Sequence, residues 1–357
     1  MARVLVLGGT SYVAQFVLQR LQQDETLRVA TGDTTREIDV VACTIRSEPF
    51  APLPAGFATA GSESASLSIR PVQVYWQVDV VDLQTLEKCI KDFHPTVIIN
   101  CTAISSPAAC EKDPEKARNV NEPRGVVSLL GNLPWQIRFV HLSTDFVYDG
   151  KKPLGDCYKE DDTVESSELS VYGAGKLRFD QFLLEYDSSP NLQVLVLRIA
   201  NVVGPAAPLF PDKSAPKFMQ WLHRQLFQPE IDSTPLKLWS DEFRSYLYIV
   251  DLVTIMLKLL AIGSNNHATL VNVGGLEAFS RVEIAHKYLA ACALHNPTAV
   301  DKVTREIEPT LRAQVNLGYP SPLNTKLSTE LLGELLSNFT WTPTGEILYK
   351  ISRSFLA

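Results

Sequence analysis

The N-terminus of the chain has the pattern of a short strand, a glycine turn and a helix. Residues 3–7 are rich in Val and Leu, Gly8 and Gly9 follow at once, and apolar residues then recur at helical spacing as far as Leu21. A strand, a glycine turn and a helix in this order direct backbone N–H groups at a pyrophosphate. The residues predicted to hold a dinucleotide at this turn are Gly8, Thr10, Ser11, Tyr12 and Val13.

Two residues of this turn depart from the usual glycine fingerprint of dinucleotide-binding turns. Ser11 stands at the second glycine position, where a Cβ is expected to crowd the closest approach of backbone and phosphate. Ala14 stands at the third position, where a small residue serves the packing of the helix on the strand. Ala14 is therefore the milder change. A strand, turn and helix without any ligand is the alternative interpretation.

Strands alternate with helices through about residue 203, which predicts a parallel sheet covered by helices on both faces. The predicted fold class is therefore α/β, with a doubly wound parallel sheet. Ligands of such sheets bind at the carboxyl ends of the strands. This rule brings together residues that are far apart in the sequence. Those expected along this one edge are Gly8, Arg46, Ala103, Thr144 and Ile199.

The end of the second strand bears on the choice of dinucleotide. Residues 39–44 are predicted to form this strand, and Arg46 follows it. An acidic residue there suits a ribose 2′-hydroxyl, whereas an arginine suits a 2′-phosphate. We therefore predict NADP rather than NAD; the alternative is that Arg46 merely begins a polar loop. Ends of two later strands are predicted to border the rest of the cofactor, with ordinary strand-end capping as the alternative: Asp79, Val80, Cys101, Thr102 and Ala103.

A tyrosine and a lysine four residues apart, Tyr172 and Lys176, open a predicted helix. Residues at this spacing share one face of a helix, so the positive charge of Lys176 is expected to lower the pKa of the Tyr172 phenol. Such a phenol is a proton donor near neutral pH. Tyr148 and Lys152 have the same spacing, but they lie in a segment with Asp-Gly and Pro that predicts a turn. An ordinary surface pair on an amphipathic helix is the alternative interpretation of Tyr172 and Lys176.

Composition excludes several classes of protein. The chain has 357 residues, 45% of them hydrophobic, so it can build a large core. Its net charge of −7 argues against nucleic acid or an anionic membrane as a partner. Its six cysteines have no paired metal-ligand spacing, so no metal site is predicted. The first strand follows Met1 at once and residues 247–262 are interrupted by charges, so we expect neither a signal peptide nor a membrane span, and a cytoplasmic location.

Several segments resemble the extended short-chain dehydrogenases/reductases. Within this family, the similarity is greatest to dTDP-4-dehydrorhamnose reductases and to the regulatory beta subunits of methionine adenosyltransferase. The segments that carry the resemblance are the turn at Gly8, residues 100–103, 143–150, Tyr172 with Lys176, Arg198-Ile199, 244–251 and 322–327. The resemblance implies a Rossmann fold with a smaller C-terminal substrate-binding lobe. It implies Thr144 as the hydroxyl partner, Tyr172 as the proton donor and Lys176 as the residue that ties Tyr172 to the cofactor ribose.

The resemblance also suggests how the chain is divided. Residues 1–203 are expected to form the NAD(P)-binding Rossmann domain, and residues 246–276 to return to it. Residues 204–245 and 277–357 are expected to form the substrate-binding lobe. Asp145 and Arg244 are the expected substrate-binding residues. Two polar or irregular segments, 24–37 and 47–71, are predicted to be surface loops.

Phe146 separates this chain from relatives that eliminate water. Sugar-nucleotide dehydratases of the family carry Asp-Glu after the catalytic threonine, whereas this chain has Asp145-Phe146, and a phenyl ring transfers no proton. Reduction of a keto group needs only a hydride and one proton. The favoured hypothesis is therefore an NADP-dependent reductase of a nucleotide-linked 4-keto sugar. The alternative hypothesis is a non-catalytic NADP-binding regulatory subunit with a protein partner.

Overall fold

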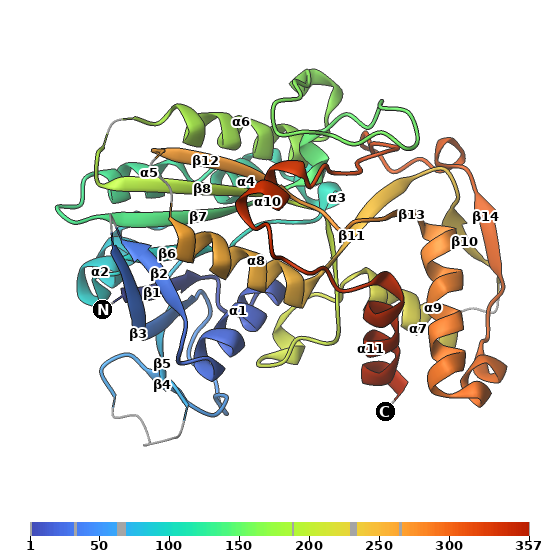
Figure 1. Cartoon of the computed structure of the whole chain (residues 1–357), viewed down its shortest axis with the longest axis horizontal. Helices are drawn as coiled ribbons and strands as arrows, with labels where there is room; N and C mark the ends of the chain where they lie inside the picture. The colour runs from blue at the N-terminus through green and yellow to red at the C-terminus, as the bar shows by residue number, and fades with distance from the viewer. Residues whose placement is uncertain are drawn as a thin grey trace.

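The computed structural model describes residues 2–31, 34–62, 69–187, 189–228, 234–263 and 266–356 (Figure 1). Its centre is a nine-stranded sheet in the order β12-β8-β7-β6-β1-β3-β5-β4, with β2 paired to β3. The pairing is parallel throughout except between β2 and β3. The strands are β1 (Ala2–Leu7), β2 (Arg28–Thr31), β3 (Thr34–Ile45), β4 (Phe57–Thr59), β5 (Val72–Trp76), β6 (Val97–Asn100), β7 (Ile137–Thr144), β8 (Leu192–Ile199) and β12 (Ala268–Val273).

Helices cover both faces of this sheet, because alternate residues of each strand point to opposite sides. Val4 and Val6 of β1 join a core with α1 and α8, whereas Leu5 and Leu7 join a second core with α2, α5 and α6. The doubly wound α/β fold is therefore confirmed. The helices of this part are α1 (Tyr12–Gln23), α2 (Leu83–Phe93), α3 (Pro107–Lys112), α4 (Pro114–Asn121), α5 (Arg124–Gly131), α6 (Val171–Glu185) and α8 (Ile249–Ile262).

Most of the remaining elements lie at the other end of the molecule, whereas α10 packs beside β12 of the main sheet (Figure 1). A three-stranded sheet joins β9, β11 and β13, and a two-stranded sheet joins β10 and β14. Helix α9 begins at a capping box formed by Ser280 and Glu283. The elements are β9 (Asn201–Val203), α7 (Phe218–Phe227), β10 (Leu236–Trp239), β11 (Phe243–Tyr248), β13 (Ala278–Ser280), α9 (Arg281–His295), β14 (Ile307–Thr310), α10 (Glu330–Leu335) and α11 (Thr344–Leu356).

The prediction of surface loops at 24–37 and 47–71 is wrong in part. Residues 28–31 and 34–37 form an antiparallel hairpin that extends β3. Val29 is fully buried in the core that includes α8, while Arg28 and Glu37 form an ion pair of 2.6 Å across the two strands. Thr35, Arg36 and Glu37 are exposed, so the sequence of this hairpin resembles a loop. In the second segment, β4 adds an edge strand beside β5, and residues 63–68 lie outside the described residues.

The start of α1 is joined to the loop that follows β9. The Gln15 side chain is fully buried and accepts hydrogen bonds from the backbone N–H groups of Leu209 (3.0 Å) and Phe210 (2.6 Å). Its amide donates to the carbonyl oxygens of Phe210 (3.1 Å) and Thr10 (2.9 Å). The Tyr12 hydroxyl donates to the Pro205 carbonyl at 2.8 Å. These bonds fix residues 205–210 to the helix that carries the glycine turn.

Among the residues that the structure describes, no helix has the length and apolar character needed to cross a lipid bilayer. The same residues contain no group of three or more His, Cys, Asp or Glu side chains arranged to hold a metal ion.

Candidate active site

A cavity of about 510 Å³ opens at the carboxyl edge of the main sheet. Its walls come from the start of α1, the ends of β6, β7 and β8, the start of α6 and segments of the C-terminal part. The predicted site residues that line it are Ser11, Tyr12, Val13, Cys101, Thr102, Ala103, Thr144, Asp145, Tyr172, Lys176, Ile199 and Arg244. Ala103, Thr144 and Ile199, which the strand-end rule places on one edge, thus meet in one cavity. Arg244 joins them from β11 (Phe243–Tyr248).

Gly8 occupies a backbone conformation that favours glycine. Its φ is +75°, and a Cβ built on it would lie 2.8 Å from Cγ2 of Thr102. Ser11 has an ordinary φ of −67° and caps α1, because its hydroxyl accepts from the N–H of Ala14 at 3.4 Å. The serine therefore causes no backbone strain at the second glycine position. Thr10 and Gly8 support this turn but do not line the cavity.

Arg46, Asp79 and Val80 lie apart from the main cavity. Arg46 and Asp79 border a separate hollow of about 340 Å³. The Arg46 side chain is 72% exposed, and its guanidinium lies 3.9 Å from the Asp79 carboxylate. Val80 is buried, 5% exposed. The two charged residues therefore meet at the ends of β3 and β5, as the strand order requires, while the assignment to a ribose 2′-phosphate stays a prediction.

Tyr172 and Thr144 are brought together by a close contact between α6 and the turn after β7. Ser170 caps α6 by accepting from the N–H of Gly173 at 3.1 Å. A Cβ on Gly173 would overlap the carbonyl oxygen of Phe146, so only glycine allows the helix this close. The approach places the Tyr172 phenol beside the Thr144 side chain in the cavity wall. The Thr144 hydroxyl itself donates to the Asp145 carboxylate at 3.2 Å. Glycine at this position is therefore a requirement of the site.

The prediction that Lys176 lowers the Tyr172 pKa is wrong for this structure. Burial raises the pKa of Tyr172 well above its ordinary value, and the neighbouring Thr144 side chain offsets only part of this effect. The negative charge of Asp145 adds to the increase in the Tyr172 pKa. Helical spacing brought the two side chains to one face, but it contained no information on how deeply that face is buried.

Lys176 is fully buried and its amine faces β7. Its Nζ donates to the Leu142 carbonyl at 2.9 Å and lies 3.4 Å from Nε2 of His141. Burial lowers the pKa of Lys176 to about 8, with Asp180 acting in the opposite direction. Asp180 forms an ion pair with Arg198 at 3.0 Å, so its negative charge stabilises the Lys176 ammonium less than an unpaired carboxylate would.

The two predicted substrate-binding residues are connected by Thr325. Its hydroxyl donates to the Asp145 carboxylate at 2.6 Å and accepts from the Arg244 guanidinium at 2.7 Å. Arg244 also donates to the Pro322 carbonyl at 2.8 Å and is only 4% exposed. Asp145 is buried, which raises the pKa of its carboxyl group. Both side chains therefore line the cavity, but several of their polar atoms already have partners.

Sequence reasoning missed a cluster of charges around Glu242. This buried carboxylate lies 3.3 Å from Arg244, 3.7 Å from Arg281 and 3.9 Å from Arg312. Glu242, Arg244 and Arg281 line the cavity. Three guanidinium groups around one carboxylate leave a local excess of positive charge. Only the closeness of Glu242 to Arg244 is visible in the sequence, because Arg281 and Arg312 come from other segments. Lys217 and Tyr319 also line the cavity and were not predicted.

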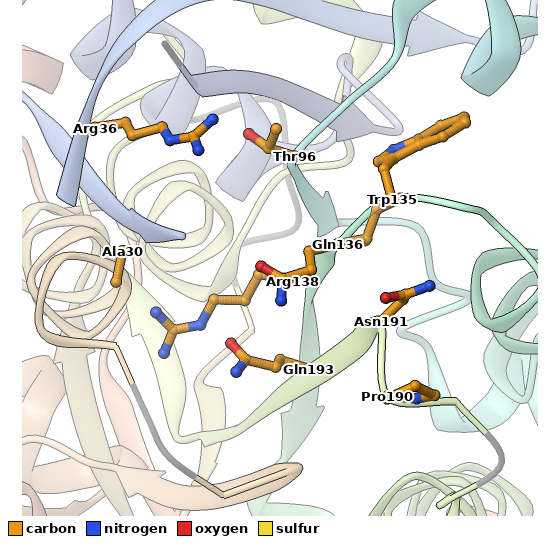
Figure 2. A pocket seen from close by; sticks show the side chains of 10 residues that line it. Ala30, Arg36, Thr96, Trp135, Gln136, Arg138, Pro190, Asn191 and Gln193 are labelled. Atoms are coloured by element: carbon orange, nitrogen blue, oxygen red, sulfur yellow. The ribbon is translucent and has the colours of Figure 1, made fainter. Parts of the chain in front are cut away.

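A smaller cavity of about 260 Å³ opens at the opposite, amino edge of the sheet (Figure 2). Arg138 and Gln193 reach into this region from β7 and β8. The Arg138 guanidinium donates to the carbonyls of Leu259 (3.2 Å) and Leu260 (2.9 Å), near the end of α8. This arginine therefore caps a helix, where a cation is favoured by the helix dipole. The predicted catalytic residues Thr144, Tyr172 and Lys176 lie instead in the cavity at the carboxyl edge of the sheet.

A family model described as the NAD dependent epimerase/dehydratase family matches residues 4–274. The chain belongs to this family. Methionine adenosyltransferase 2 subunit beta of Pongo abelii is 27% identical over 264 residues, covering 72% of this chain and 70% of that protein. A dTDP-4-dehydrorhamnose reductase of Sinorhizobium fredii is 35% identical over 118 residues, covering 33% of this chain and 38% of the reductase. The predicted resemblance is confirmed.

Solved structures confirm the fold over the whole length. The UDP-glucose 4-epimerase of Thermus thermophilus, solved as a complex with NAD, matches with a TM-score of 0.70 and 20% identity. The match covers 99% of each chain. At this level of identity the likeness establishes the fold alone.

Proposed function

We propose that the chain is an NADP-dependent reductase of a nucleotide-linked 4-keto sugar. The observation that carries this proposal is that Tyr172 and Thr144 lie side by side in a cavity that also includes the start of α1, directly after the glycine turn. A buried phenol beside a hydroxyl is suited to hold a carbonyl oxygen and protonate it. Family membership and the relatives that are sugar-nucleotide enzymes support the same class of reaction.

The raised pKa of Tyr172 fits a proton donor, because the phenol keeps its proton until the carbonyl oxygen gains charge. In the proposed reaction Thr144 and Tyr172 bind the carbonyl oxygen, and the phenol proton moves to that oxygen. The nicotinamide, when bound, supplies the hydride to the carbonyl carbon. Tyr172 then carries the negative charge, and Lys176 on the same helix face stabilises it.

The glycine turn fits a dinucleotide. Gly8 has the positive φ of such turns, and the start of α1 faces the cavity at Ser11 and Tyr12. Backbone N–H groups at a helix start favour a pyrophosphate. Arg46, which is largely exposed, is proposed to bind the 2′-phosphate of NADP.

The substrate side of the cavity is proposed to lie in residues 204–245 and 277–357. The excess of positive charge around Glu242 suits the diphosphate of a nucleotide sugar. Phe146 also lines the cavity, and it leaves no carboxylate at that position for the elimination of water. Reduction is therefore favoured over dehydration.

NADPH oxidation with a panel of dTDP- and UDP-linked 4-keto sugars tests the proposal. Tyr172→Phe should lower turnover by about 100- to 10,000-fold while NADPH binding is kept. Tyr349→Phe, at an exposed tyrosine in α11, is the control and should leave turnover unchanged. Full turnover of Tyr172→Phe would exclude the phenol as the proton donor.

Binding measurements test the dinucleotide. Arg46→Ala should weaken NADP binding by about tenfold or more and leave NAD binding unchanged, because one charge-assisted hydrogen bond to phosphate contributes about 1.5–3 kcal/mol. Arg28→Ala removes another exposed arginine, one paired with Glu37 in the β2–β3 hairpin, and should change neither affinity. Equal losses for NADP and NAD would refute the role of Arg46.

A second candidate function is a non-catalytic regulatory subunit that binds NADP. The greater coverage of methionine adenosyltransferase beta subunits among the sequence relatives favours it, as does the amine of Lys176, which is directed at the Leu142 carbonyl. In that case the protein binds the dinucleotide but does not oxidise NADPH with any keto sugar as the substrate. It would then co-purify with a methionine adenosyltransferase catalytic subunit when the two are mixed.

A further inference from the structure

A chain of buried polar groups runs behind the candidate site, from the strand end beside the glycine turn to Lys176. The N–H and the hydroxyl of Thr102 donate to Oδ1 of Asn100 at 3.1 and 2.6 Å. Nδ2 of Asn100 lies 3.5 Å from Nδ1 of His141. Nε2 of His141 lies 3.4 Å from Nζ of Lys176. Asn100, His141 and Lys176 are each at most 2% exposed, so water does not easily replace these contacts.

The direction of the hydrogen bonds in this chain is fixed at one end. A backbone N–H can only donate, so the Asn100 atom that faces Thr102 must be the amide oxygen. The other amide atom, Nδ2, therefore faces His141, and it too can only donate. Nδ1 of His141 must then be the acceptor.

The protonation of His141 follows from this direction. Burial lowers the pKa of His141 well below its ordinary value, so the ring is neutral and carries one proton. With Nδ1 as acceptor, this proton lies on Nε2 and is directed at Lys176. An ammonium has three donors and no acceptor, whereas an uncharged amine has a lone pair that accepts the Nε2 proton. In the other tautomer of His141 the proton lies on Nδ1 and faces Nδ2 of Asn100, so two donors would meet there instead.

We infer that His141, oriented by Asn100, is a positioning residue that shifts the equilibrium of Lys176 from its ammonium form towards the uncharged amine in the ligand-free protein. The amine then accepts from His141 and donates to the Leu142 carbonyl, so both contacts are satisfied.

The charged and titratable groups around Lys176 do not reverse this preference. Asp180, one turn later on α6, and Cys110 of α3 favour the ammonium, but burial has the larger effect and lowers the pKa of Lys176 to about 8. The Asp180 carboxylate is shared with Arg198 of β8 and with the Ser143 hydroxyl of β7. Tyr172 is neutral because burial raises its pKa. His141 therefore adds to an effect that burial begins.

This arrangement has a consequence that rests on the proposed function. If a bound dinucleotide ribose draws the Lys176 side chain away from His141, the pKa of Lys176 rises. The uncharged amine, which is the major form above about pH 8, then takes up a proton. Dinucleotide affinity then falls as the pH rises above about 8, because the proton that binding requires becomes scarce.

The inference itself is tested without substrate or cofactor, by NMR of the intact protein labelled with ¹³C at the lysine ε carbons. Lys176→Arg assigns the Lys176 signal. We expect the pH titration of the Lys176 signal to have its midpoint near pH 8 in the wild type. His141→Gln places an acceptor opposite the amine and should raise the midpoint by about one pH unit or more. His223→Gln, at another partly buried histidine that contacts Tyr288, is the matched control and should leave the midpoint unchanged.

A second variant keeps the test open if His141→Gln does not fold. Asn100→Asp places a carboxylate beside Nδ1 that accepts a hydrogen bond from it. The ring proton then lies on Nδ1, Nε2 becomes an acceptor, and the Lys176 midpoint should also rise. A wild-type midpoint at the ordinary lysine value of about 10.4, or a midpoint that neither variant moves, would overturn the inference. Absence of turnover with every keto sugar bears on the proposed reductase and leaves these titrations unaffected.

Discussion

Replacing Gly173 by alanine should separate Tyr172 from Thr144. The new Cβ would overlap the Phe146 carbonyl oxygen and would lie 3.1 Å from the carbonyl carbon. Relieving this overlap needs a displacement of α6 on the order of 1 Å, and a misplacement of that size can lower turnover by about 100-fold. Overpacking of this kind also costs roughly 1–3 kcal/mol, of which the better helix propensity of alanine offsets about 0.5–1 kcal/mol.

Gly175→Ala is the matched control in the same helix. The atoms nearest to its new Cβ are the ends of flexible side chains, Oε1 of Glu122 at 3.2 Å and a terminal nitrogen of Arg178 at 3.6 Å. We expect this variant to keep its turnover and its stability. Both variants are compared by NADPH oxidation with the active keto sugar and by urea unfolding. The explanation fails if Gly173→Ala keeps full turnover, or if the two variants lose the same amount.

Three further predictions concern stability. The lowered Lys176 pKa means that the unfolded chain binds more protons than the folded one between about pH 8 and 10.4, so the wild-type free energy of unfolding rises across this window. The free energy of unfolding of Lys176→Met, measured by urea titration, should rise about 2 kcal/mol less than that of the wild type between about pH 7 and 9.5. Identical pH profiles of the wild type and the variant would contradict this. Gly8→Ala should lower the free energy of unfolding by roughly 1 kcal/mol or more and weaken dinucleotide binding, because of the positive φ and the contact with Thr102; unchanged melting and binding would refute it. Glu242→Gln should cost about 3 kcal/mol, because it leaves three guanidinium groups without their carboxylate, and a change below about 1 kcal/mol would show that solvent already neutralises them.

The parts of the fold that local periodicity determines could be predicted from the sequence. The strand at 2–7, the helix with Tyr172 and the capping box at Ser280 all depend on patterns within a few residues. The hairpin of residues 28–31 and 34–37 was missed, because one fully buried valine within a polar segment is a weak signal.

The site was predictable where the strand-end rule applies, and less so where burial decides. Thr144 and Cys101 lie in the cavity because strand ends share one edge of the sheet. The raised Tyr172 pKa depends on how much of the protein covers the phenol, and spacing along one helix does not contain that information. The partners of Glu242 come from separate segments for the same reason.

The hydrogen bonds of Gln15 and Tyr12 to residues 205–210 restrict how the parts of the molecule around the cavity can move relative to one another. Residues 205–210 are attached to α1, although they follow β9 in the chain. A hinge between the two halves of the molecule therefore cannot sit directly after β9. A rotation between the two halves would have to pivot farther along the chain, past Phe210, and would leave α1 and residues 205–210 in place relative to one another.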